Sequence, residues 1–258
     1  PFDDIDVVYG QGTLMIEMLE DFPEIDTLLI PVGGGGLLSG CSIAAKSLKK
    51  NIKIIAIQTE NFPSFYNLFY KKKHSFSTGS VAEGIAVNKI GKINSKILNK
   101  YVDKCVLVKE KKIEEAISLF LMKDKTLVEG AGAIGLAAIL EGKIPKTSRN
   151  IGLIACGGNL DSRVLSSLLM RELVRKKKIL TLSIDMDDKP GQLNEIAALC
   201  SQEKINILEV EHSRFTLDLS VRSARLNITL ETRNEKQAQT IISKIKNLEF
   251  KVEEKKKN

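Results

Sequence analysis

The chain has 258 residues, of which 43% are hydrophobic and 28% charged, a balance typical of one or two globular domains and not of a disordered or fibrous chain. The formal net charge of +7 is spread along the chain, and the lysine runs at residues 71–73, 176–178 and 255–257 are short and lack interleaved aromatic residues. No nucleic-acid partner is therefore predicted.

Membrane insertion and export are not predicted either. The longest uncharged stretch, residues 27–45, is interrupted by Pro31 and a glycine run, so it is a poor candidate for a membrane-spanning helix. The acidic start of the chain lacks the basic residues of a signal peptide. The four cysteines are widely separated and form no C-x-x-C pair, so neither a metal site nor a disulfide framework is expected. These features predict a soluble, cytoplasmic protein.

Short β-branched runs alternate with helical patterns in the first 175 residues. Strands are predicted at residues 27–32, 52–59, 104–108 and 150–155, and helices at residues 11–21, 37–50, 112–123, 130–141 and 161–175. The strands are mostly apolar, as expected when both faces of a sheet are buried. The alternation predicts an α/β fold with a parallel, helix-covered sheet.

After the basic residues 175–178 the pattern changes to strand, helix, strand, strand, helix, strand. The expected elements are residues 179–185, 192–203, 205–214, 221–232, 235–246 and 250–253. This βαββαβ order predicts a ferredoxin-like α+β domain, with an antiparallel sheet and both helices on one face. We place the boundary near residue 176, which gives domains 1–175 and 176–258.

The sharpest local feature is the glycine run from Gly33 to Gly36, which follows an apolar strand and opens a helix. Without side chains, consecutive backbone N–H groups can surround an anion, and the helix N-terminus adds a partial positive charge. The run lacks the Gly-Lys-Ser/Thr of a Walker loop and the spacing of a dinucleotide fingerprint. It predicts a phosphate site, and the alternative is a flexible strand-to-helix turn.

A second glycine turn, Gly157-Gly158-Asn159, follows Cys156 at the end of the strand 150–155. Ligands of open α/β sheets bind at the carboxyl ends of the strands, so both glycine turns are expected to face one crevice. Taken alone, Cys156 has a plain structural alternative as a buried small apolar residue.

Five motifs occur in order along the first part of the chain: Pro-Phe-Asp-Asp with Gly-Gln-Gly-Thr within residues 1–13, Pro-Val-Gly-Gly-Gly-Gly-Leu at 31–37, Ala-Glu-Gly-Ile-Ala-Val at 82–87, Val-Glu-Gly-Ala-Gly-Ala at 128–133, and Cys-Gly-Gly-Asn at 156–159. Together they resemble the threonine ammonia-lyases (threonine dehydratases) of the fold-type II class of pyridoxal-phosphate enzymes. Residues 188–193 and 207–215 are similar to the regulatory ACT domain of the single-ACT form of these enzymes. The resemblance covers essentially the whole chain.

The resemblance implies roles for individual residues. The phosphate of pyridoxal 5'-phosphate would be bound by backbone donors of Gly33, Gly34, Gly35, Gly36 and Leu37. Cys156 would face the pyridine nitrogen, with the wall beside it shaped by Gly157, Gly158 and Asn159. A neutral thiol there suits elimination of a β-hydroxyl better than transamination. By the same analogy Glu83 and Glu129 would lie near the ring and the phosphate, although each alone also fits a first-turn or surface charge.

One segment of the family pattern is missing. The Schiff-base lysine of these enzymes lies in a Ser-Phe-Lys-x-Arg-Gly type segment, and no lysine of this chain has an arginine two positions later. A Ser-x-Gly-Asn-His loop is also absent, and residue 1 is proline. We therefore expect the chain to be the C-terminal portion of a longer enzyme, with no catalytic residue of its own and no activity alone.

The resemblance implies that the complete enzyme deaminates L-threonine, and also L-serine, to a 2-oxo acid and ammonia within amino acid metabolism, for example isoleucine biosynthesis. Biosynthetic and degradative roles both stay open. Two rivals remain, a serine racemase of the same fold class and a non-catalytic, amino-acid-binding ACT regulator.

The turn formed by Asp188, Lys189, Pro190 and Gly191 is the predicted site of an amino acid effector. Proline fixes φ, and the glycine opens a helix whose N–H groups can meet a carboxylate. The alternative is a tight strand-to-helix connection. Because the predicted antiparallel sheet leaves its edge strands free, two such units are expected to pair, which predicts a homo-oligomer.

Overall fold

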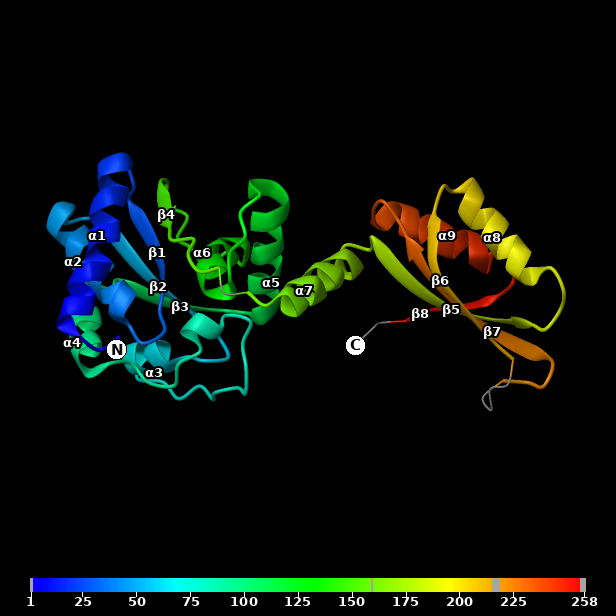
Figure 1. Cartoon of the computed structure of the whole chain (residues 1–258), viewed down its shortest axis with the longest axis horizontal. Helices are drawn as coiled ribbons and strands as arrows, with labels where there is room; N and C mark the ends of the chain where they lie inside the picture. The colour runs from blue at the N-terminus through cyan, green and yellow to red at the C-terminus, as the bar shows by residue number, and fades with distance from the viewer. Residues whose placement is uncertain (1, 159, 215–218, 256–258) are drawn as a thin grey trace. The chain divides into compact units, whose positions relative to one another are not determined.

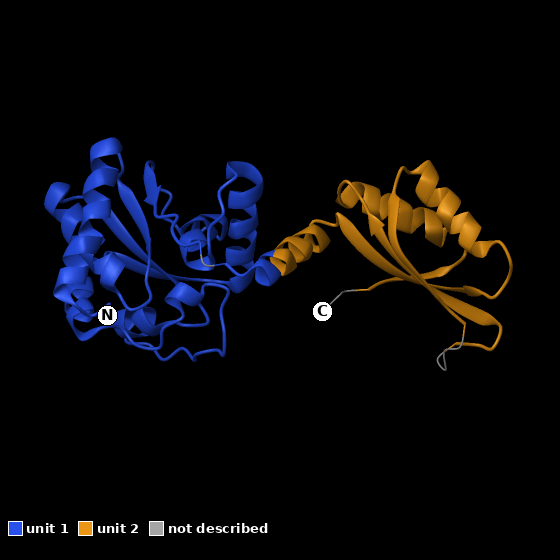
Figure 2. Ribbon diagram, in the orientation of Figure 1, with its two compact units in different colours: residues 1–165 blue, residues 166–258 orange. Residues whose placement is uncertain are grey.

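The computed structural model describes residues 2–158, 160–214 and 219–255 (Figure 1). The chain divides into two compact units, residues 1–165 and 166–258 (Figure 2). The division falls inside helix α7 (Ser162–Arg175), and the domain boundary near residue 176 stays a prediction. Among the described residues, no helix is long and apolar enough to cross a membrane.

The first unit contains a four-stranded parallel sheet with the order β3-β2-β1-β4, which confirms the predicted parallel sheet. Its strands are β1 (Thr27–Pro31), β2 (Lys53–Thr59), β3 (Lys104–Val108) and β4 (Ile151–Leu153). Its helices are α1 (Ile5–Asp21), α2 (Gly36–Leu48), α3 (Ser64–Tyr70), α4 (Lys92–Tyr101), α5 (Glu110–Leu119) and α6 (Gly130–Leu140), with the short turns η1 (Glu83–Ile85) and η2 (Phe120–Asp124).

Helices cover both faces of this sheet. Leu28 of β1 shares a buried core with Met15 of α1 and Leu38 of α2. The next residue of the strand, Leu29, points to the opposite face, where a Cβ added to Gly135 of α6 would lie 3.7 Å from its Cβ. Burial on both faces explains why the strands of the sheet are apolar at consecutive positions.

The first helix begins earlier than predicted, at Ile5 instead of residue 11. The reason is a local cap, because the side chain of Asp4 accepts a hydrogen bond (2.9 Å) from the N–H of Asp6. The predicted helix 112–123 is α5 followed by the π-helical turn η2.

Helices α3 and α4 are missing from the sequence prediction. The start of α4 is capped from a distant part of the chain, because the carboxylate of Asp3 accepts hydrogen bonds from the N–H groups of Lys92 (2.8 Å) and Ile93 (2.9 Å). A cap supplied from 89 residues away leaves no helix-start signal in the neighbouring sequence.

The second unit contains an antiparallel sheet with the order β6-β7-β5-β8. Its strands are β5 (Ile179–Asp187), β6 (Asn206–Ser213), β7 (Ser223–Glu231) and β8 (Lys251–Glu254), and its helices after α7 are α8 (Gln192–Gln202) and α9 (Glu235–Lys246). Leu182 and Ile184 of β5 share one core with Ile196 of α8 and Ile241 of α9. Both helices therefore cover the same face, which confirms the predicted ferredoxin-like βαββαβ fold.

Candidate functional site

The two glycine turns of the first unit lie at one edge of its sheet. Strands β1 and β4 are parallel neighbours, with Thr27 paired to Ile151, so the segments that follow them leave the sheet on the same side. There they border a cavity of about 300 Å³, at the lower end of the range for small-molecule sites. The predicted site residues that line it are Gly33, Gly34, Gly35, Gly36, Leu37, Glu129 and Cys156.

The glycine loop presents a row of unused donors to this cavity. None of the backbone N–H groups of residues 33–37 donates a hydrogen bond to another described residue, and the first helical bond at this end of α2 runs from the Ser39 N–H to the Gly35 carbonyl (2.8 Å). A Cβ on Gly34 would lie 2.3 Å from the ring of Phe2, so a side chain at that position would require the ring to move. Free N–H groups at a helix N-terminus form an anion site.

Cys156 supplies a neutral, half-buried thiol to the same cavity. Burial raises its pKa above the usual value, and the negative charge of Glu129 raises it further. Cys41 of α2 is buried nearby, and burial together with Cys156 raises the pKa of its thiol to about 12. Both cysteines are therefore protonated at neutral pH.

Glu129 connects the glycine segments around the cavity. Its N–H donates a hydrogen bond to the carbonyl of Gly157 (3.0 Å). Its carboxylate oxygen lies 3.1 Å from the position of a Cβ on Gly84 and 2.1 Å from that of a Cβ on Gly157, whose φ is +80°. Because neither glycine has a side chain, both positions leave room for the side chain of Glu129.

Two predicted residues lie in a neighbouring cavity. Glu83 and Gly158 line a space of about 230 Å³ that Glu129 also lines, so Glu129 lies between the two cavities. Asn159 lies outside the residues that the structure describes. The cofactor roles of Glu83 and of residues 157–159 therefore stay predictions.

Several residues of the site were not predicted, among them Phe2, Gln11 and Asn94. Phe2 and Gln11 line the main cavity, and their places in the Pro-Phe-Asp-Asp and Gly-Gln-Gly-Thr motifs were a signal for them. Asn94 of α4 supports the glycine loop from outside, because its fully buried side chain donates hydrogen bonds to the carbonyls of Gly34 (3.2 Å) and Phe2 (2.7 Å). No signal pointed to Asn94, since its helix was not predicted.

In the second unit, residues 188–191 form the exposed turn between β5 and α8. Gly191 precedes α8 with a φ of +99°. Lys189 donates a hydrogen bond to Asp187 (2.7 Å), which raises the pKa of Lys189, and Arg214 donates one to Asp188 (3.0 Å). Effector binding at this turn stays a prediction.

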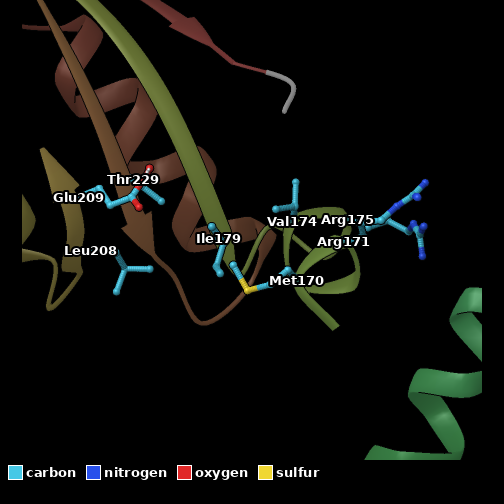
Figure 3. A pocket seen from close by; sticks show the side chains of 8 residues that line it. All are labelled: Met170, Arg171, Val174, Arg175, Ile179, Leu208, Glu209 and Thr229. Carbon is cyan, nitrogen blue, oxygen red and sulfur yellow. Dashed lines mark hydrogen bonds between the residues drawn. The ribbon is translucent and has the colours of Figure 1, made fainter. Parts of the chain in front are cut away.

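A larger cavity of about 560 Å³ lies elsewhere in the second unit, between the end of α7 and the sheet face opposite α8 and α9 (Figure 3). It is lined by Met170, Arg171, Val174, Arg175, Ile179, Leu208, Glu209 and Thr229. The Thr229 hydroxyl donates to Glu209 (3.2 Å), while the two arginine side chains extend away from Glu209. This lining does not include the predicted effector turn.

Comparison with known proteins separates the two parts of the chain. Residues 1–157 match the "Pyridoxal-phosphate dependent enzyme" family, and residues 180–250 match the ACT domain. The L-threonine ammonia-lyase of Thermotoga maritima is 35% identical over 243 residues, which are 93% of this chain and 60% of that protein. This chain therefore spans about 60% of the length of that relative.

Solved structures give similar matches to the first part. The T.th. threonine deaminase matches with a TM-score of 0.57 and 31% identity, over 62% of this chain and 61% of that chain. Maize serine racemase matches with a TM-score of 0.57 and 34% identity, over 65% of this chain and 54% of that chain.

Proposed function

Because the chain belongs to the family of pyridoxal-phosphate-dependent enzymes and carries an ACT domain, we propose that it forms part of an L-threonine ammonia-lyase that also accepts L-serine. The observation that carries this proposal is the cavity in which the free N–H groups of residues 33–37 meet the neutral thiol of Cys156. The reaction would convert L-threonine to 2-oxobutanoate and ammonia.

A serine racemase is the second candidate, because the maize enzyme matches with the same TM-score as the threonine deaminase. That match covers 65% of this chain, whereas the ammonia-lyase of Thermotoga maritima aligns with 93% of it. The longer alignment extends into the ACT domain and favours the lyase. A free-standing ACT regulator is disfavoured by the match of residues 1–157 to the enzyme family.

The residues of the main cavity fit pyridoxal 5'-phosphate. The N–H groups of residues 33–37 would hold its phosphate, since they have no other described acceptor and no side chain of residues 33–36 fills the space. Cys156 would meet the pyridine nitrogen as a neutral hydrogen-bonding group, because its pKa is raised. When bound, the cofactor supplies an electron sink for charge at the α-carbon of the amino acid. Removal of the α-proton is assigned to a lysine of the complete enzyme.

Cofactor binding tests the proposal directly. We expect the 258-residue chain to bind pyridoxal 5'-phosphate at least about tenfold more tightly than pyridoxal, since a hydrogen bond to a charged group contributes about 1.5–3 kcal/mol. Titration calorimetry with both compounds measures the ratio. The complete enzyme that contains this chain is expected to release 2-oxobutanoate from L-threonine, and the chain alone is not. Equal affinities for the two compounds would contradict a phosphate site in this loop.

We also infer a cytoplasmic homo-oligomer whose second unit binds an amino acid. Edge strand β6 supports pairing of two copies, because Leu208 and Val210 on it are 45% and 48% exposed. All four cysteines are free, as is typical of proteins in a reducing compartment, and this supports the location.

Effector binding at the turn of residues 188–191 gives a separate test. Because a ligand stabilises only the state that it binds, isoleucine or valine at a hundredfold excess over its dissociation constant is expected to stabilise the second unit by about 2.7 kcal/mol. For a unit of this size, that stabilisation raises the melting temperature by roughly 11–22 °C. Asp188→Asn should weaken this shift by removing a partner for the ammonium group. Glu253→Gln, which removes an exposed carboxylate from edge strand β8 at the position opposite Ser183 and not at the turn, should leave it unchanged. An undiminished shift in the Asp188 variant would place the effector elsewhere.

A further inference from the structure

The carbonyl of Gly34 is tied to the start of helix α4. It accepts a hydrogen bond from the Gly91 N–H (3.1 Å) and a second from the Nδ2 of Asn94 (3.2 Å). Gly34 belongs to the loop whose free N–H groups line the main cavity, while Gly91 and Asn94 are absent from the lining of that cavity. The two bonds therefore fix the orientation of one peptide of the loop from behind.

Asn94 uses both hydrogens of its amide for backbone carbonyls of the site, one for Gly34 and one for Phe2 (2.7 Å). The side chain is fully buried, and its Oδ1 has no hydrogen-bond partner. A buried oxygen without a partner destabilises the fold, and an apolar residue of the same size would avoid that loss. The same apolar residue would leave the carbonyls of Gly34 and Phe2 without these donors, so what distinguishes an asparagine here is its contact with the two carbonyls.

The geometry of a trans peptide connects these bonds to the cavity. The structure has no cis peptide bond among the described residues, and in a planar trans peptide the C=O and N–H bonds point in opposite directions. Since the Gly34 carbonyl points toward α4, the N–H of Gly35 points away from α4. This N–H has no acceptor among the described residues.

Resting on the function proposed above, we propose that Asn94 is a positioning residue, which orients the Gly34–Gly35 peptide so that the Gly35 N–H donates to the cofactor phosphate. The close approach of the two elements supports this role. A Cβ on Gly35 would lie 2.8 Å from the Cβ of Asn94, so only glycine, with its φ of +101°, lets α4 lie this close to the loop.

The test compares two ligands that differ only in the phosphate. Asn94→Asp keeps the size of the side chain, but it replaces the amide donors by a carboxylate facing two carbonyl oxygens. We expect its affinity for pyridoxal 5'-phosphate to fall about tenfold to a hundredfold, while its affinity for pyridoxal stays unchanged. A general loss of structure would instead weaken both ligands together. The matched control is Asn67→Asp, because Asn67 also bridges backbone groups, those of His74, outside the cavity.

Two further measurements distinguish a failure of the proposed function from a failure of the proposed role of Asn94. Asn94→Ala removes the donors without adding a charge and should shift the ratio in the same direction, with melting curves confirming that each variant is folded. In the unaltered chain, the amide NMR signal of Gly35 should shift on addition of pyridoxal 5'-phosphate or inorganic phosphate and not of pyridoxal. If the unaltered chain does not distinguish pyridoxal 5'-phosphate from pyridoxal, the proposed function fails. If the unaltered chain does distinguish the two ligands, two results would show that the role of Asn94 is wrong. One is a folded Asn94 variant with the same ratio of affinities as the unaltered chain, and the other is an amide signal of Gly35 that does not shift with pyridoxal 5'-phosphate.

Discussion

Replacing Gly132 of α6 by alanine is expected to lower the free energy of unfolding by about 1–3 kcal/mol, the usual effect of overpacking a buried contact. An added Cβ would lie 2.0 Å from the carbonyl oxygen and 2.6 Å from the nitrogen of Cys156. These are backbone atoms, so no side-chain rotation relieves the clash and α6 must separate from the segment that follows β4. The better helix propensity of alanine, about 1 kcal/mol, does not offset this.

The same substitution is expected to weaken ligand binding in a way that differs from the Asn94 variants. Cys156 would move with its backbone, and its proposed partner is the ring, which pyridoxal and pyridoxal 5'-phosphate share. Both affinities should therefore fall together. In the complete enzyme, displacement of a site residue by about 1 Å can reduce the rate by about a hundredfold.

Two other glycines provide graded controls, measured by urea unfolding. Gly10→Ala in α1 meets no atom within 4 Å and should leave stability equal or improve it by about 0.5–1 kcal/mol. Gly135→Ala lies in the same helix as Gly132, but the nearest atom to its added Cβ is the Cβ of Leu153 at 3.1 Å, so its effect should be intermediate. A Gly132 variant as stable as the Gly10 variant would show that the contact with Cys156 is looser than the structure indicates.

The parts of the fold that were predictable are those with local signals. The strands are buried on both faces and are therefore read as apolar runs. The loop is crowded by Phe2 and Asn94, which explains the run of glycines there. The meeting of this loop with Cys156 followed from the rule for carboxyl ends of parallel strands, because β1 and β4 are neighbours.

The remaining features depend on contacts between distant segments. The cap of α4 comes from Asp3, and Asn94 donates its hydrogen bonds to the carbonyls of residues 2 and 34. Since these partners lie far away in the sequence, no local pattern identifies either contact. The family resemblance implied that Glu83 and Glu129 both lie near the cofactor. Glu129 lines the main cavity and Glu83 lines the neighbouring one, so the role of Glu83 stays a prediction. Spacing along the chain does not determine on which side of a shared wall a side chain lies.

The second large effect is expected from Cys156→Asp, with Cys156→Ser as its counterpart. Serine keeps a small, neutral hydrogen-bonding group, so the complete enzyme should keep its activity within a few-fold of the original. Aspartate places a carboxylate in a half-buried position beside Glu129. At the pyridine nitrogen it would favour the protonated ring, and we expect the rate of the proposed threonine deamination to fall about a hundredfold or more.

The pH dependence of stability offers a readout of the Asp variant that needs no cofactor. Burial and the charge of Glu129, which raise the pKa of the Cys156 thiol, should also raise that of a carboxyl group at this position. The folded state would then bind more protons than the unfolded state, so stability should fall as the pH rises from the unfolded pKa of about 4 through the folded pKa. The serine variant has no titrating group there and should lack this loss. Two results together would show that residue 156 faces solvent instead of the cofactor ring. The Asp and Ser variants would have the same dependence of melting temperature on pH, and the turnover of the Asp variant would be unchanged.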